Sequence, residues 1–234
     1  MTPHWTNHRI VPPALAGLLS LGLWLLSSPT LAHPHAWIDL RVQLELDTHG
    51  ALQGMRQEWV FDPTYSYLLL QEMDALQPGL EFERALRAMS ARMLGNLRDH
   101  DYFTEITVGG ERIAIPEVGD SSLQWRQRRL HFHFELRFDT DEGEVSVPLE
   151  YRVYDPSYWI EILHDPHDVI HLDGLPGCDA QIESAQPERW LAAYAATLER
   201  ERRGPVPDLG RSFAERVRVD CPRPEMGTGS AVRQ

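Results

Sequence analysis

The chain contains no lysine, only two cysteines and a single long apolar run, and each scarcity excludes something. All 22 basic residues are arginines, against 35 acidic residues, which gives a formal charge of −13. Such an acidic balance disfavours polyanionic partners, so we expect that neither nucleic acid nor an anionic membrane surface binds this chain. A cationic ligand is the natural counterpart of its surface.

The common catalytic motifs are also missing. The sequence has no Gly-x-Ser-x-Gly elbow, no His-Glu-x-x-His zinc helix, no glycine-rich phosphate loop and no Cys-x-x-Cys. Carboxylates are numerous, but no pair stands out by its spacing. The sequence therefore indicates no particular enzyme class.

The apolar run belongs to a segment typical of a cleaved export signal, residues 1–32. Arg9 precedes the run at 10–26, and Thr30 and Ala32 occupy the −3 and −1 positions of a signal peptidase site. An uncleaved membrane anchor is the alternative, but the run contains Pro12, Pro13 and Gly17 and is shorter than the ~20 apolar residues that a spanning helix needs. We expect a periplasmic protein that does not insert into the membrane.

The mature chain opens with strand patterns and continues with helical ones. Apolar and polar residues alternate over 36–46, and a second strand pattern at 52–61 follows a turn at 48–50, which predicts a hairpin. Strong helix formers fill 64–77 and 81–97, with Pro78-Gly79 between them. The sequence therefore predicts a helical hairpin, at about 64–98, inserted among strands.

Short β-rich runs separated by turn signals follow, and a last helix is predicted at 187–203. The runs are 102–108, 112–115, 123–125, 129–138, 140–143, 145–154, 158–163 and 169–172. This pattern predicts a mainly β (α+β) fold: one antiparallel β-sandwich-like domain over 33–222 with the inserted helical hairpin and a C-terminal helix. The Pro/Gly/Ser tail at 223–234 is predicted to be disordered.

Cys178 and Cys221 form an even pair, which in an exported protein favours a disulfide over a metal site. A disulfide that closes the segment between these two cysteines would stabilise the fold by roughly 3 to 4 kcal/mol in the chain-entropy model.

The strongest candidate metal site is His33-Pro34-His35, because cleavage after Ala32 makes His33 the first residue. Its α-amine and ring, with the ring of His35, offer three nitrogens to a divalent transition metal such as Zn, Ni, Co or Cu. Pro34 has no N–H, which excludes the chelate built from backbone amide nitrogens and leaves a histidine-brace-like arrangement. The alternative is an exposed polar strand start.

Other histidines form weaker candidate sites. His131 and His133 fall on one polar strand face, opposite a row of phenylalanines, and could complete a metal site. His164 and His167 share a proline-containing loop with Asp165, Asp168 and His171 and could capture metal or simply face solvent. His49 and His100 are expected to be surface residues in turns.

Several segments together resemble the DUF1007 family. They are 33–39 (His-Pro-His-Ala-Trp-Ile-Asp), 59–62 (Trp-Val-Phe-Asp) followed by Tyr65-Ser66, 101–104 (Asp-Tyr-Phe-Thr), 154–158 (Tyr-Asp-Pro-Ser-Tyr), 177–178 (Gly-Cys) and 217–222 (Val-Arg-Val-Asp-Cys-Pro). The resemblance implies a periplasmic component of an uncharacterised ABC-type transport system, often encoded beside nickel/cobalt exporters, and hence a membrane metal transporter or exporter as partner. It draws attention to His33, His35, Trp37 and Asp39, and to Asp62 and Asp155. Each of these last two precedes a proline, a position that also suits a structural turn.

The sequence thus predicts a periplasmic accessory protein that holds a divalent transition metal at its mature N-terminus and serves a transport system. Two other hypotheses stay open: a copper histidine-brace redox enzyme, and a protein-interaction module without a metal function.

Overall fold

A computed structural model describes residues 34–115, 117–138, 147–168, 170–174, 176–198 and 206–221. Residues 1–32, His33, the run predicted at 140–143 and the tail at 223–234 lie outside the described residues.

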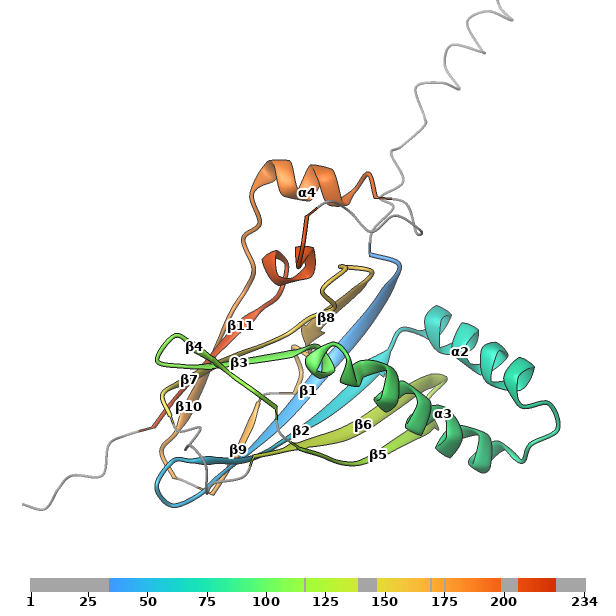
Figure 1. The fold of residues 1–234 in the computed structure, drawn as a ribbon, viewed down its shortest axis with the longest axis horizontal. Helices are drawn as coiled ribbons and strands as arrows, with labels where there is room; N and C mark the ends of the chain where they lie inside the picture. Colours follow the sequence, from blue (N-terminus) through green and yellow to red (C-terminus); the bar gives the residue numbers. More distant parts are fainter. Residues whose placement is uncertain are drawn as a thin grey trace, which may run out of the picture. The chain divides into compact units, whose positions relative to one another are not determined.

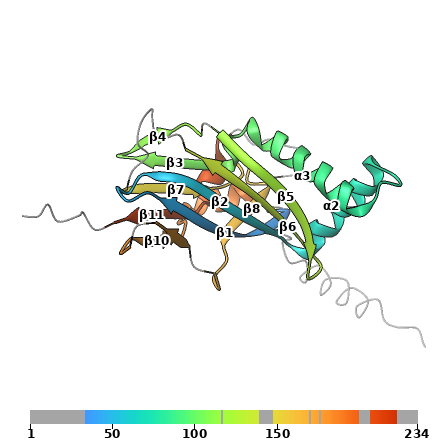
Figure 2. The same cartoon turned by 90° about the horizontal axis from the view of Figure 1, so that it is seen from below.

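The described strands form two sheets (Figures 1 and 2). The first has the order β5-β6-β2-β1-β8, and β9 also pairs with β1. Its strands are β1 (Ala36–Leu46), β2 (Leu52–Phe61), β5 (Glu117–Arg126), β6 (Arg129–Arg137), β8 (Ile160–His164) and β9 (His171–Asp173). The second has the order β10-β11-β7-β3-β4, with β3 (Thr104–Val108), β4 (Glu111–Ile113), β7 (Leu149–Val153), β10 (Asp179–Glu183) and β11 (Arg216–Asp220).

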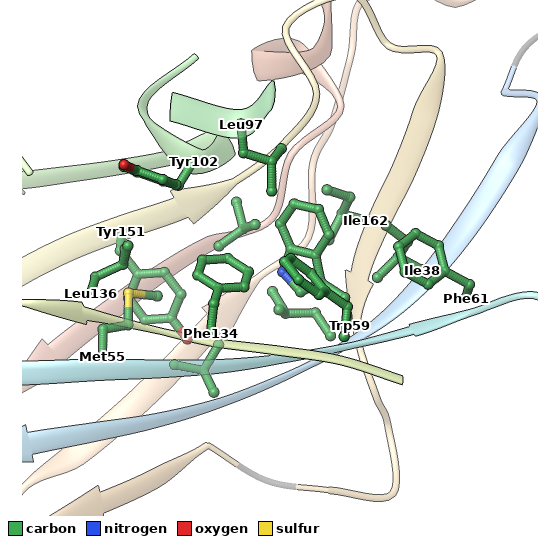
Figure 3. Packing of buried hydrophobic residues seen from close by; sticks show 14 of the residues in the cluster. Ile38, Met55, Trp59, Phe61, Leu97, Tyr102, Phe134, Leu136, Tyr151 and Ile162 are labelled. Atoms are coloured by element: carbon green, nitrogen blue, oxygen red, sulfur yellow. The ribbon is translucent and has the colours of Figure 1, made fainter. Parts of the chain in front are cut away.

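The core lies between the two sheets, because the predicted alternation places one apolar face of each strand inward. Along β1 every second residue from Ala36 to Leu46 is buried, and Phe132, Phe134 and Leu136 form the buried face of β6. Figure 3 shows Trp59, Phe134 and Leu136 from the first sheet packed together with Tyr151 from the second. The predicted aromatic core face of β6 is thus confirmed.

The predicted helical hairpin is present as α2 (Pro63–Leu76) and α3 (Phe82–Arg98). Asp62 caps α2 by accepting hydrogen bonds from the backbone N–H groups of Thr64 and Tyr65. Helix α3 runs beside β5 (Figure 2) and buries Leu86, Met89 and Leu97 in the core. These apolar residues at helical spacing are therefore packing residues.

The C-terminal helix, α4 (Arg189–Ala195), is shorter over the described residues than the prediction of 187–203. Leu191 and Ala195 belong to a second small apolar cluster with Leu209, from the 3-10 turn η2 (Leu209–Ser212), and Tyr158. A further 3-10 turn, η1 (Asp101–Phe103), replaces the first residues of the strand predicted at 102–108.

Two features of the sheets differ from the prediction. Strands β8 and β9 pair with β1 in parallel, although an antiparallel sandwich was expected. Periodicity reveals which face of a strand is buried but not which strand lies beside it, so this pairing could not be predicted. Strands β10 and β11 were also not predicted. Strand β10 is largely exposed and its apolar pattern is weak, whereas β11 alternates regularly and its pattern was missed.

The predicted disulfide between Cys178 and Cys221 is confirmed. A disulfide persists in oxidising compartments, so this bond fits a location outside the cytoplasm. Among the described residues, no helix is long and apolar enough to cross a membrane.

Candidate functional site

Two of the candidate histidines, His131 and His133, lie on the outer face of the first sheet, the face turned away from the core. The strand registers align Arg41 on β1, Glu58 on β2 and His133 on β6 in one row across the sheet. His131 lies on the same face, two residues before His133. The predicted shared face of the two histidines is therefore confirmed, and Glu58 joins them from the neighbouring strand.

Glu58 is the centre of this group, which we call the Glu58 cluster: Arg41, Glu58, His131 and His133. Its Oε1 atom lies 2.8 Å from His131 Nδ1 and 3.6 Å from His133 Nε2. Its Oε2 atom accepts a hydrogen bond from Arg41 at 3.2 Å. The two carboxylate oxygens thus face different partners, imidazoles on one side and a guanidinium on the other.

The cluster shifts the acidity of its own groups. Burial alone would raise the pKa of Glu58, but the hydrogen bond to His131 and the charges of His133 and Arg41 outweigh burial and lower it. Burial lowers the pKa of His133; Glu58 opposes this effect, and the charge of Arg126 adds to it. At neutral pH the cluster therefore combines an ionised carboxylate with a neutral imidazole at His133.

His131 carries an unusual feature. Its imidazole is only 9 % exposed, and its Nε2 atom is buried without a hydrogen-bond partner among the described residues. Because Nδ1 meets an ionised carboxylate, Nδ1 carries the proton and donates to Glu58. Nε2 is a buried polar atom without a partner among the described residues, which costs about 1–3 kcal/mol and is rare in folded proteins.

A loop between β8 and β9 borders the same face. Arg41 reaches it through Asp165, whose Oδ2 accepts a hydrogen bond at 2.9 Å, and through Asp168 at 3.1 Å. His171 Nε2 lies 3.0 Å from Asp168 Oδ1. One arginine therefore connects the Glu58 cluster to Asp165 and Asp168 of this loop and, through Asp168, to His171 at the start of β9.

A cleft of about 410 Å³ opens beside these groups. Its ionisable lining residues include two arginines and two histidines, Arg41, Arg56, His133 and His171, and four carboxylates, Glu58, Asp120, Glu135 and Asp168. With the histidines neutral, the lining has more negative than positive formal charge. The cleft therefore favours a cation over an anion.

His164 lies on the opposite face of the sheet. It pairs in register with the buried Leu40, and its ring is inserted between the sheets, where Nδ1 lies 2.8 Å from Glu215 Oε2 and Nε2 lies 3.0 Å from the Tyr151 hydroxyl. Both ring nitrogens already have partners. A metal ion could bind His164 only by displacing one of them, and the sheet separates it from His131 and His133.

His167 is exposed in the turn at 165–168, where its backbone N–H donates to Asp165. The histidines predicted as one loop cluster are thus divided: His164 points to the core, His167 to solvent, and His171 lines the cleft beside Asp168. Alternation along a strand followed by a turn explains this division.

His35 lies at the start of β1. Its backbone N–H donates to the carbonyl of Trp159 at 2.9 Å, and its ring centre is 5.5 Å from that of Trp159. Trp37, two residues on, donates its backbone N–H to Asp62 and its indole N–H to Glu161. The beginning of the strand is therefore held from two sides, while His33 lies outside the described residues.

Asp62 and Asp155 both organise turns. Asp62 caps α2, and the Asp155 carboxylate accepts backbone N–H donors from Ser157, Trp159 and Ile160. Asp155 is 6 % exposed, and these bonds position Trp159 beside His35. The prediction that both aspartates serve structural turns is confirmed.

Across the described residues, no group of three or more His, Cys, Asp or Glu side chains is arranged to hold a metal ion. The Glu58 cluster therefore presents at most two such groups to one ion as it stands.

Comparison with known proteins decides the family. The model of the family described as "Protein of unknown function (DUF1007)" matches residues 18–221. The chain belongs to this family. An uncharacterised protein from Haemophilus influenzae (strain ATCC 51907 / DSM 11121 / KW20 / Rd) is 21 % identical over 206 residues, covering 87 % of this chain and 97 % of its own length.

Sequence reasoning missed Glu58 and Arg41. Both stand at polar positions of predicted strands, so the alternation placed them on the outer face. What it could not supply was the pairing of β2 with β6, which brings Glu58 to the two histidines.

Proposed function

We propose that this DUF1007 protein is a periplasmic accessory of a metal transport system, and that it holds a divalent transition metal at its mature N-terminus through His33 and His35. The observation that carries the proposal is the fixed position of His35, which the Trp159 carbonyl and ring hold at the start of β1. A ligand held in place loses little conformational entropy when it binds a metal.

The disulfide and the acidic surface support the same proposal. The Cys178–Cys221 bond fits an oxidising compartment, in which an export signal at 1–32 would be removed. The formal charge of −13 favours cations over anions. The metal would then pass to or from a membrane transporter or exporter.

The proposal is tested on protein purified from the periplasm, with its N-terminal mass measured first. His33→Ala and His35→Ala should each lower the affinity for Ni(II), Zn(II) or Cu(II) by at least ~10-fold, measured by competition with a chromophoric chelator. His49→Ala and His100→Ala are matched controls, because both side chains are exposed. Equal losses from all four substitutions would contradict the proposal.

A second candidate function, a protein-interaction module of a transporter, is favoured by a different observation. The helical hairpin exposes several large apolar side chains: Tyr67, Leu68, Leu76, Leu80 and Phe82. Several exposed apolar residues within one helical hairpin favour a partner surface. If the purified mature protein binds none of Zn(II), Ni(II), Co(II) and Cu(II) with a dissociation constant below ~1 mM, this function is favoured over the first.

A further inference from the structure

We propose that Glu58 and His133 form a second, weaker site for a divalent transition metal on the outer face of the first sheet, in which His131 positions the carboxylate and water completes the coordination. This site is independent of the N-terminal site proposed above.

The geometry of the two ligand atoms carries the proposal. Glu58 Oε1 and His133 Nε2 are 3.6 Å apart. Two ligands bound to one ion at about 2.1 Å lie about 3.0 Å apart at an octahedral angle and about 3.4 Å apart at a tetrahedral one. A shift of a few tenths of an ångström therefore brings both atoms to one metal ion.

The protonation pattern leaves a lone pair on each of these atoms. Arg126 Nη2 lies 3.5 Å from His133 Nε2, and a guanidinium can only donate, so Nε2 presents its lone pair. The facing Glu58 oxygen also has only lone pairs. Arg126 is exposed and meets this lone pair only at the limit of hydrogen-bond distance, so a metal ion that binds both atoms takes the place of the Arg126 contact.

His131 supplies the independent observation. Its Nδ1–H donates to Glu58 Oε1, while its buried Nε2 has no partner among the described residues. Stability alone does not explain a buried ring with one unsatisfied nitrogen. A hydrogen bond from outside the coordination sphere that orients a ligating carboxylate is a common feature of metal sites and explains why such a ring is retained.

The surroundings favour a cation of this kind. The cleft beside His133 is lined by more carboxylates than guanidinium groups. Arg41, which neutralises the other oxygen of Glu58, is shared with Asp165 and Asp168. With two protein ligands and water, the site would be weaker than a three-nitrogen site.

The test uses the mature protein with His35→Ala, which removes a ligand of the first site, and CoCl₂ as the probe. Equilibrium dialysis should show that this protein still binds cobalt. Adding His133→Gln should weaken that binding at least ~10-fold, whereas His167→Ala should leave it unchanged because His167 is exposed in the turn. His133 is half-buried, with 31 % of its side chain exposed, so His133→Gln is compatible with the fold.

His131 is tested by a pair of variants. His131→Asn keeps a nitrogen donor at the place of Nδ1 and should preserve cobalt affinity, whereas His131→Ala should lower it. In ring-selective NMR, Co(II) should broaden the His131 and His133 signals before that of His49. The proposal is overturned if the His35→Ala protein binds no cobalt, or if His35→Ala/His133→Gln binds it equally well. If His33→Ala removes binding at the N-terminal site and leaves cobalt binding at Glu58 and His133 intact, that result tests the N-terminal proposal and not this one.

Discussion

Cys178 and Cys221 lie directly opposite each other, one position beyond the Asp179–Asp220 pair at the end of the β10–β11 ladder. The bond therefore joins an edge strand, β10, to the strand that anchors it. The span of 43 residues between the cysteines includes α4 and η2. The disulfide thus fixes a long connection whose own apolar cluster is small.

Replacing both cysteines by alanine should lower the free energy of unfolding by about 3–4 kcal/mol, because the unfolded chain regains the entropy of a long closed loop. Urea unfolding of the wild-type protein and the double variant measures this difference. The wild-type protein in reductant should match the variant. Coincident unfolding midpoints would contradict the prediction.

Glu105→Gln should destabilise the protein by about 3 kcal/mol at pH 7, since Glu105 is 5 % exposed and pairs with Arg211 and Arg152. Burial raises the pKa of Glu105, but the hydrogen bond and charge of Arg211 outweigh burial and lower it. Because the pKa of Glu105 is lower in the folded than in the unfolded protein, the ionised carboxylate stabilises the fold above the unfolded pKa of about 4.5. This stabilisation is lost as the pH falls from there through the folded pKa.

The cost of Glu105→Gln should therefore shrink when unfolding is measured at pH 3 instead of pH 7. Glu111→Gln, at an exposed position of β4, is the control and should change stability by less than ~0.5 kcal/mol at either pH. A cost for Glu105→Gln that is the same at both pH values would show that the carboxylate charge is not what stabilises this pair.

His164→Ala should destabilise the fold by about 2 kcal/mol without changing metal stoichiometry. It leaves Tyr151 and Glu215, both facing the protein interior, without their ring partner. Thermal unfolding and a metal titration on the same sample measure the two effects. Loss of one bound metal ion from His164→Ala would instead assign this histidine to a metal site.

Arg126→Gln should strengthen cobalt binding at the Glu58–His133 site by about two- to fivefold, because it removes an exposed positive charge 3.5 Å from His133 Nε2. Arg87→Gln, on the exposed side of α3, should leave the affinity unchanged. The gain should disappear in 1 M salt, which screens exposed charges. Weaker binding after Arg126→Gln would show that Arg126 supports the bound state.

Local periodicity was sufficient for much of the fold. The strict alternation from Ala36 to Leu46 predicted both ends of β1, and the change from β-branched residues to helix formers predicted α2 and α3 to within two residues. These patterns are local consequences of which face each element buries. The pairing of β1 with β8 joins segments more than a hundred residues apart, and no local pattern encodes it.

The same limit applies to the candidate sites. The three nitrogens offered by the mature N-terminus indicated His35 as a ligand, and the two-residue period of a strand predicted that His131 and His133 share a face. Neither could show that Glu58 lies between these histidines, or that His164, which is close to His167 in sequence, points into the core. Which side chains meet across a sheet depends on the register of its strands, and which face a side chain lies on depends on whether its position along the strand is odd or even.

The α-amine of His33 is the centre of the proposed function, and adding one glycine before His33 tests it most directly. The added residue keeps both imidazoles and moves the amine away from the fixed start of β1. The affinity for Cu(II), Ni(II) or Zn(II), measured by competition with a chromophoric chelator, should fall by more than ~1.4 kcal/mol, a factor of ten. Equal affinities of the native and glycine-extended proteins for all three metals would contradict the account.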